Sequence, residues 1–207
     1  MELAQRDLWP ERMVELIWVG WSISWLATSF WSDRAQKRLA SLDTWTYRAA
    51  LIAGAILLAP PTAWLLSEHP LWRLGYRGTS ALTASMLIGL FLTWWARIYL
   101  GRIWSGVVTR KEDHKLIDTG PYAFIRHPIY TGLVIALLAT AAVEATVPAL
   151  LGSVVMTFGF WLKARAEEQF LRIELGPGSY RAYCRRVPML IPFTSRRAGF
   201  NRSEAAE

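Results

Sequence analysis

Five apolar runs, each bounded by charged residues, proline or glycine, constrain the fold of this 207-residue chain more than any other feature. A helix needs about 20 apolar residues to cross the hydrocarbon core of a bilayer. The runs are Val14–Trp31, Trp45–Leu66, Ser80–Leu100, Ile129–Ala142 and Ala149–Leu162. A soluble helical bundle would need a polar face on some of its helices, whereas these runs are apolar all round. The sequence therefore predicts an all-α integral membrane protein of about five transmembrane helices.

The last two runs are the shortest, and a turn of sequence VEATVP joins them. They are predicted to form a helical hairpin in which each arm barely spans the membrane. Pro60 and Pro61 are expected to kink or shorten the second run. The first run is longer than the apolar part of a typical signal peptide, so it is taken to be retained as a helix.

Basic residues outnumber acidic ones, 23 to 16, and most of them follow the first, third and fifth runs. By the positive-inside rule, the loop between the third and fourth runs and the C-terminal segment are predicted to be cytosolic, so that the C-terminus forms a cytosolic cap. The net charge of +7 then reflects contact with anionic lipid. No nucleic-acid partner is predicted.

No internal repeat, low-complexity tract or long linker divides the chain, so residues 1–207 are predicted to form a single membrane domain. Within it, residues 1–100 hold the first three spans, residues 101–194 hold most of the unusual polar residues, and residues 195–207 form a polar tail that is expected to be disordered. One cysteine, Cys184, excludes an intramolecular disulfide framework. The three histidines are far apart in sequence, so no metal site is predicted.

Some residues of the apolar runs are given a structural reading. Trp18, Trp21 and Trp25 share one face of a helix and are predicted to make packing or lipid contacts. Arg48 and Arg97 are predicted to snorkel or to bridge helices, although a charge inside a membrane is also a hint of function.

Two polar blocks, residues 101–132 and residues 163–192, fall on the predicted cytosolic side. Arg126 and His127 directly precede the fourth run, with Tyr130 in its first turn. Glu167 and Glu168 are placed where the fifth run ends. A two-helix hairpin returns the chain to its starting side, so these five side chains can be neighbours at the membrane surface although about 40 residues separate the two groups.

The two blocks resemble the isoprenylcysteine carboxyl methyltransferases and the related phospholipid methyltransferases, which are integral-membrane enzymes that use S-adenosylmethionine. The resemblance extends from about Arg97 to Phe193 and leaves the first two runs unmatched. The matching residues are Gly101, Trp104, Ser105, His114, Leu116, Gly120-Pro121-Tyr122, Arg126-His127-Pro128-x-Tyr130-x-Gly132, Glu167-Glu168, Gly176, Tyr180, Tyr183, Val187-Pro188 and Ile191-Pro192.

The resemblance implies that residues 101–194 are a methyltransferase-like catalytic region with S-adenosylmethionine as the cofactor. It also implies a cofactor pocket formed by the last two helices and the C-terminal segment, with an acceptor that arrives from the bilayer. The residues implied to line that pocket are His114, Leu116, Gly120, Pro121, Tyr122, His127, Tyr130, Glu167 and Glu168.

Methyl transfer from a sulfonium is an in-line displacement in which positioning and the electric field dominate. Glu167 or Glu168 suits the cationic sulfonium and amino group of the cofactor. Arg126 and Arg165 suit a substrate carboxylate. The predicted catalytic residues are therefore Arg126, Arg165, Glu167 and Glu168.

Three classes of function remain open. The first, and the favoured one, is carboxyl O-methylation of an isoprenylcysteine, with N-methylation of a phospholipid amine or methylation of another small lipophilic nucleophile as alternatives; an amine would need a base, for which Glu168 could serve. The second is a sterol-reductase-like enzyme that uses NADPH, because sterol reductases carry a stretch similar to Arg-His-Pro-x-Tyr. A chain of 207 residues leaves little room for the additional spans and motifs of such an enzyme. The third is a non-enzymatic membrane protein.

The predicted partners are the lipid bilayer and a lipophilic or prenylcysteine acceptor. The predicted location is the cytoplasmic membrane of a bacterium or the endoplasmic reticulum of a eukaryote, with the active site on the cytosolic side.

Overall fold

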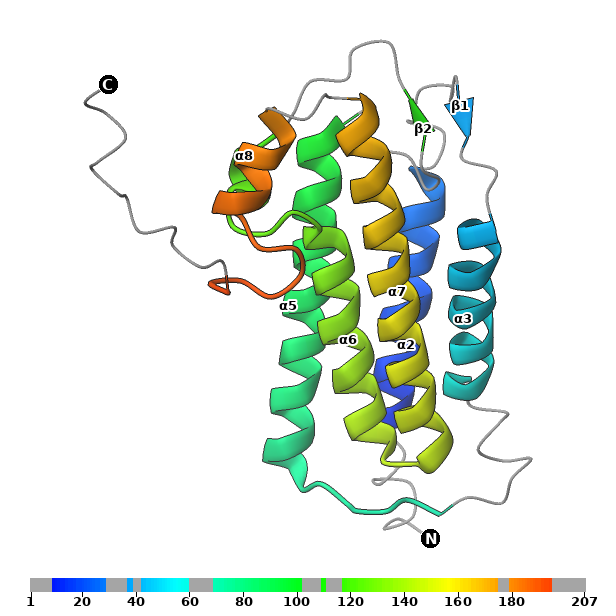
Figure 1. The fold of residues 1–207 in the computed structure, drawn as a ribbon. Coiled ribbons are helices and arrows are strands. Elements are labelled where there is room, and N and C mark those ends of the chain that lie inside the picture. The colour runs from blue at the N-terminus through cyan, green and yellow to red at the C-terminus, as the bar shows by residue number, and fades with distance from the viewer. Residues whose placement is uncertain are drawn as a thin grey trace, which may run out of the picture.

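The computed structural model describes residues 9–28, 37–38, 42–59, 69–101, 109–110, 117–174 and 179–194. Six α-helices and a short 3-10 helix lie in these ranges (Figure 1). They are α2 (Trp9–Ala27), α3 (Leu42–Leu58), α5 (Tyr76–Leu100), η3 (Gly120–Ala123), α6 (Pro128–Glu144), α7 (Val147–Glu174) and α8 (Ser179–Arg186).

The five longer helices form a bundle in which α3 packs against α7, α5 against α6, and α6 against α7. Their directions alternate along the chain (Figure 1). At one end of the bundle, the two-residue strand β1 (Lys37–Arg38) pairs with β2 (Thr109–Arg110) in antiparallel register, with Lys37 opposite Arg110. This pairing joins the loop after α2 to the loop after α5, and it is a small exception to the all-α prediction.

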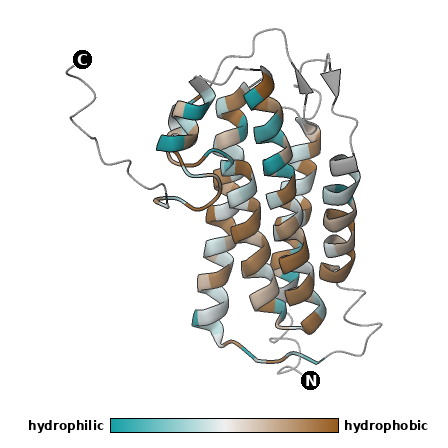
Figure 2. Ribbon diagram, viewed as in Figure 1, coloured by the Kyte–Doolittle hydropathy of each residue, from teal (hydrophilic) through white to brown (hydrophobic). Residues whose placement is uncertain are grey.

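Two of the described helices, Tyr76–Leu100 and Val147–Ile173, are long and apolar enough to cross a membrane. Thr44–Leu58 and Pro128–Glu144 are apolar but shorter. Each of the five predicted runs overlaps one helix of the bundle, so the helical architecture is confirmed, whereas five crossings remain a prediction. Figure 2 shows apolar residues along much of the bundle and polar ones gathered near the end where α8 lies.

The predicted hairpin is present, since α6 and α7 pack together and a two-residue turn connects them. Ala145 ends α6 in the left-handed conformation with φ 54°. The predicted end of the second arm at Leu162 is wrong, because α7 continues for about three more turns to Glu174. Glu167 and Glu168 therefore lie within a helix and not at its end, and α7 is much longer than an arm that barely spans.

Two pairs of glycines set the closest helix contacts. Gly89 of α5 lies against Gly132 of α6, and Gly54 of α3 against Gly152 of α7, so closely that a Cβ at any of the four would clash with the backbone carbonyl of its partner. Small residues of this kind let membrane helices approach closely. Gly132, which belongs to the Arg-His-Pro-x-Tyr-x-Gly stretch, thus has a packing role.

The first helix is attached to the others by tryptophan side chains. The indole N–H of Trp18 donates to Thr140 and that of Trp21 to Thr93, each at 2.9 Å. Buried Arg97 of α5 donates to the carbonyl oxygen of Thr28 at 2.9 Å and lies over the ring of Trp25. These contacts confirm the packing role predicted for the tryptophans and the helix-bridging role predicted for Arg97.

Candidate active site

The start of α6 lies along the segment that follows α8. The backbone N–H of Arg126 donates to the carbonyl oxygen of Pro188 at 2.9 Å, and that of His127 to Met189 at 3.1 Å. One turn later, the hydroxyl of Thr131 donates to Leu190 at 2.7 Å. The C-terminal segment therefore fixes the backbone that carries Arg126 and His127.

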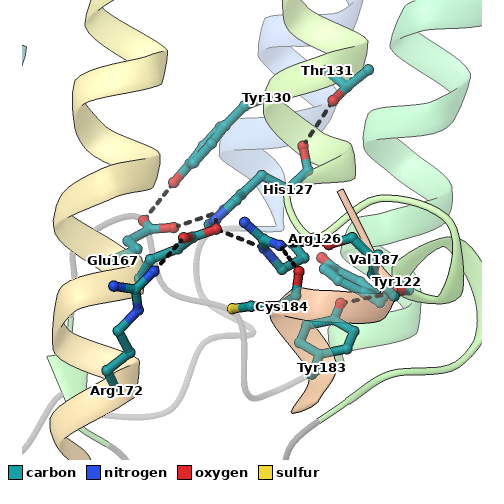
Figure 3. A network of polar contacts seen from close by, with 11 residues as sticks. Tyr122, Arg126, His127, Tyr130, Thr131, Glu167, Arg172, Tyr183, Cys184 and Val187 are labelled. Carbon is teal, nitrogen blue, oxygen red and sulfur yellow. Dashed lines mark hydrogen bonds and ion pairs between the residues drawn. The ribbon is translucent and has the colours of Figure 1, made fainter. Parts of the chain in front are cut away.

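The Arg126 side chain connects three elements (Figure 3). Its Nε donates to Oε1 of Glu168 on α7 at 2.7 Å. Its Nη1 donates to the carbonyl oxygen of Cys184 on α8 at 2.9 Å and to that of Val187. The Arg126 and Glu168 side chains are only 10% and 7% exposed. This buried, charge-assisted pairing is of the kind that sets geometry most firmly.

His127 lies between the two adjacent carboxylates of α7. Its Nδ1 is 3.5 Å from Glu167 and its Nε2 is 3.4 Å from Glu168. Burial by itself would lower the pKa of the ring, but the two carboxylates outweigh burial and raise the pKa above its ordinary value. Buried Nε2 makes no hydrogen bond of good geometry to any described residue. The imidazole is thus a donor in an anionic environment, with capacity for another partner.

Glu167 belongs to a second group of contacts on the opposite side of His127. The hydroxyl of Tyr130 donates to Oε1 of Glu167, and the Tyr130 ring stacks on His127 with the centroids 5.5 Å apart. Lys163, one helical turn before Glu167, places its Nζ 5.2 Å from the Tyr130 centroid and 6.0 Å from that of buried Tyr47 on α3. The site therefore includes an ammonium group over aromatic faces.

Sequence reasoning missed Lys163 and Tyr47. The available signal for Lys163 was its spacing, because residues four apart lie on one face of a helix, and Lys163 is four residues before Glu167. No comparable signal marked Tyr47, which reaches the site only because α3 packs against α7.

Tyr122 and Tyr183 form the wall beside Arg126. The hydroxyl of Tyr183 donates to the carbonyl oxygen of Tyr122 at 2.7 Å. Burial raises the pKa of both phenols, so both are neutral at physiological pH. Tyr183 and Tyr180 pack with Val187 in a small core between α8 and the bundle.

A cavity of about 520 Å³ opens on the face of α7 that meets α3. Glu168 contributes to its lining together with Arg165, Gln169 and Arg172 of α7 and Thr46 of α3. The guanidinium of Arg172 is 3.5 Å from Glu168, and that of Arg165 lies 4.8 Å from the Trp161 centroid. Glu168 therefore contacts Arg126 and His127, and it also borders this cavity.

The structure brings together the five side chains that the hairpin argument placed as neighbours: Arg126, His127, Tyr130, Glu167 and Glu168. Of the other predicted site residues, Pro121 and Tyr122 are buried in η3, and Gly120 contacts the ring of Tyr99. Arg165 lines the cavity and does not belong to the group of five side chains around His127. His114 and Leu116 lie outside the described residues. Among the described residues, no group of three or more His, Cys, Asp or Glu side chains is arranged so that it could hold a metal ion.

The fold and the site define a helical protein with two described helices long and apolar enough to cross a membrane, and with a buried cluster of arginine, histidine and paired carboxylates. Residues 81–173 match the model of the isoprenylcysteine carboxyl methyltransferase (ICMT) family. This region, which contains α6 and most of α5 and α7, is therefore similar to that family.

Individual relatives agree with this result. The chain is 36% identical over 117 residues to the protein-S-isoprenylcysteine O-methyltransferase of Schizosaccharomyces pombe, covering 55% of this chain and 49% of the relative. It is 31% identical over 113 residues to protein-S-isoprenylcysteine O-methyltransferase B of Arabidopsis thaliana, covering 53% and 57%. The alignments thus span about half the length of both relatives.

A longer match has a different name. The cobalt-zinc-cadmium resistance protein CzcN of Cupriavidus metallidurans is 25% identical over 155 residues, which cover 73% of this chain and 68% of the relative. Proteins similar to this chain therefore carry more than one functional name.

Proposed function

We propose that this chain is an S-adenosylmethionine-dependent methyltransferase of the membrane, and that it methylates a lipophilic acceptor, with the carboxylate of an isoprenylcysteine as the favoured substrate. The observation that carries the proposal is the pair Glu167 and Glu168 held around His127. All three residues lie inside the region that matches the family.

The residues of the site fit the proposed cofactor. S-adenosylmethionine would supply a methyl group on a cationic sulfonium, and it also carries an ammonium group. Glu167, whose side chain is 20% exposed, offers a carboxylate to these cations, and the His127 Nε2 offers a hydrogen-bond donor without a well-aligned partner among the described residues. The proposed pocket consists of His127, Tyr130, Glu167 and Glu168 with Gly120, Pro121 and Tyr122, together with His114 and Leu116 of the undescribed segment.

The contacts of the basic residues suggest different roles for them. Arg126 donates to Glu168 and to two backbone carbonyls, so we assign it the positioning of Glu168. Arg165 lines the cavity beside Glu168, and Lys163 lies next to Tyr130. These two cations are the proposed partners of the acceptor carboxylate. A carboxylate is already a nucleophile, so the reaction needs no base.

The proposed location follows from hydropathy and charge. The apolar helices span the membrane, and the end with β1, β2 and α8 faces the cytosol, from which the donor enters. In a bacterium this membrane is the cytoplasmic membrane, and in a eukaryote it is the endoplasmic reticulum.

The first experiment is calorimetric titration of the detergent-solubilised full chain with S-adenosylhomocysteine and, separately, with NADPH. Binding of S-adenosylhomocysteine alone is expected. Binding of NADPH alone would replace the methyltransferase proposal with the reductase alternative.

Methyl transfer to acetyl-farnesyl-cysteine is then compared in the wild type, in Glu167→Gln and in Glu15→Gln, which alters an exposed glutamate of α2. Glu167→Gln is expected to abolish transfer in a chain that still folds, with a lowered unfolding temperature because His127 and Tyr130 lose a carboxylate partner. The acceptor screen also includes amine and thiol lipids, because the longest of the matches described above is named for metal resistance. Full activity of Glu167→Gln would contradict the assigned site.

A further inference from the structure

α8 is amphipathic, and its outer face is basic. Tyr180, Tyr183 and Val187, the last of which directly follows α8, are buried against the bundle, whereas Arg181 and Arg185 are exposed. The helix contains no acidic residue. Arg186 pairs with Asp118 at 2.9 Å, but within the described ranges no residue pairs with Arg181 or Arg185. Two arginines one helical turn apart therefore lack a protein counter-charge among the described parts of the chain.

The segment after α8 is apolar and exposed. Ile191 is 66% exposed and Phe193 is 89% exposed. Phe124, which is two residues before Arg126 in the sequence, is 57% exposed. Figure 1 shows α8 at the side of the bundle, and Figure 2 shows that the polar helix is followed by a more apolar segment that runs toward the middle of the bundle. Basic residues beside exposed aromatic and aliphatic ones are typical of a surface that lies at a membrane interface.

We propose that α8 and residues 188–194 bind the anionic lipid surface, with Arg181 and Arg185 on lipid phosphates and with Ile191 and Phe193 among the acyl chains. The occupant is a membrane because an apolar segment and a basic face follow each other in a protein whose helices are themselves apolar. Its anionic character follows from the charge of the two arginines, for which the described parts of the chain provide no carboxylate partner.

This surface is connected to the candidate active site. The carbonyl oxygens of Cys184 and Val187 accept hydrogen bonds from Arg126, and those of Pro188 and Met189 hold the backbone of Arg126 and His127. Lipid that holds α8 against the bundle therefore also holds Arg126 on Glu168. This consequence for catalysis rests on the proposed function, whereas the lipid contact does not.

The test uses Cys184, the single cysteine of the chain, which is half-buried on α8. The full chain is placed in nanodiscs of phosphatidylcholine, or of phosphatidylcholine with phosphatidylglycerol, and the rate of maleimide labelling is measured. Each arginine near an anionic surface favours binding about fivefold. The anionic discs should therefore slow labelling at least about fivefold, and high salt should reduce the difference.

Two matched variants decide the result. Arg181→Gln/Arg185→Gln should label at the same rate in both kinds of disc. Arg73→Gln/Arg77→Gln removes the same charge from exposed residues near the start of α5 and should behave as the wild type. Equal rates for the wild type in both discs would overturn the proposal. A slowing that the Arg181→Gln/Arg185→Gln variant shares would also overturn it, because surface potential alone would then explain the effect. Since labelling requires no methyl transfer, failure of the proposed function leaves this readout intact.

Discussion

At the residue scale, Arg126 shows how one side chain can hold a site together. Its guanidinium donates hydrogen bonds to a carboxylate of α7 and to two carbonyl oxygens at or just after α8. A planar group with several fixed donors suits this task, whereas an ammonium is a point charge.

We therefore expect Arg126→Lys to destabilise the protein by about 1.5–3 kcal/mol, the usual worth of hydrogen bonds to charged groups, and to weaken S-adenosylhomocysteine binding. Thermal unfolding in detergent and calorimetric titration measure the two effects. Arg165→Lys, at an exposed position of the same protein, is the control and should unfold as the wild type does. Equal unfolding of both variants would show that the Arg126 contacts do not stabilise the fold.

His127 gives a prediction about pH. The pKa of its ring is raised in the folded protein, against the tendency of burial, by Glu167 and Glu168. A raised pKa means that the folded state binds the proton more tightly than the unfolded state does. The stabilisation is then complete below about pH 6.5, the ordinary value, and is lost as the pH rises through the raised pKa.

The comparison that checks this is thermal unfolding of the wild type and of His127→Gln from about pH 6 to about pH 9. The stability advantage of the wild type should shrink with increasing pH. His69→Gln, at an exposed residue outside the site, should not alter the pH profile. A difference between wild type and His127→Gln that stays constant with pH would contradict the raised pKa.

At the element scale, the contact between α5 and α6 depends on Gly89 and Gly132. We expect Gly132→Ala to destabilise the protein by about 1–3 kcal/mol, the common cost of overpacking, because the new methyl group meets the Gly89 carbonyl. Gly20→Ala is the matched control, since nothing lies within 4 Å of the Cβ position there. Thermal unfolding should separate the two variants. If both unfold alike, the helices can shift apart at little cost.

Hydropathy was sufficient to predict the helices of the bundle, because each apolar run is continuous and is bounded by charged residues, proline or glycine. It failed at the end of α7, where Lys163, Arg165, Glu167 and Glu168 look like the solvated end of a helix. In the folded chain, Glu167 and Glu168 are paired with Tyr130, His127 and Arg126, so the helix can continue. The β1 and β2 strands were not predictable, since two residues each give no periodicity.

The geometry of a helical hairpin was also sufficient to predict that His127 lies close to Glu167 and Glu168. It could not predict that Arg126 would be held by the backbone carbonyls of Cys184 and Val187, because a carbonyl oxygen belongs to every residue and leaves no sequence signal. The packing role of Gly132 was not predictable either, because its partner Gly89 lies in a different helix.

At the scale of the whole molecule, the alternating helices place α8 and the segment before α5 at different ends of the bundle (Figure 1). We expect the end with α8 to be cytosolic by the distribution of basic residues. Arg181→Cys and Arg73→Cys, each in a Cys184→Ala background, test this with a membrane-impermeant maleimide. In sealed vesicles of known orientation, the two positions should label from opposite faces. Labelling from the same face would contradict the predicted topology.

The short α6 has one further consequence. Its 17 residues extend about 26 Å, against about 42 Å for the 28 residues of α7, so the cluster at the start of α6 lies beside α7 well before that helix ends. In the proposed reaction, an acceptor can then react while its lipid chain stays in the membrane. Its effective concentration is the number of acceptor molecules per lipid and not per volume of water. Added inert lipid would therefore act as a diluent of the substrate, although the composition of the aqueous solution stays the same.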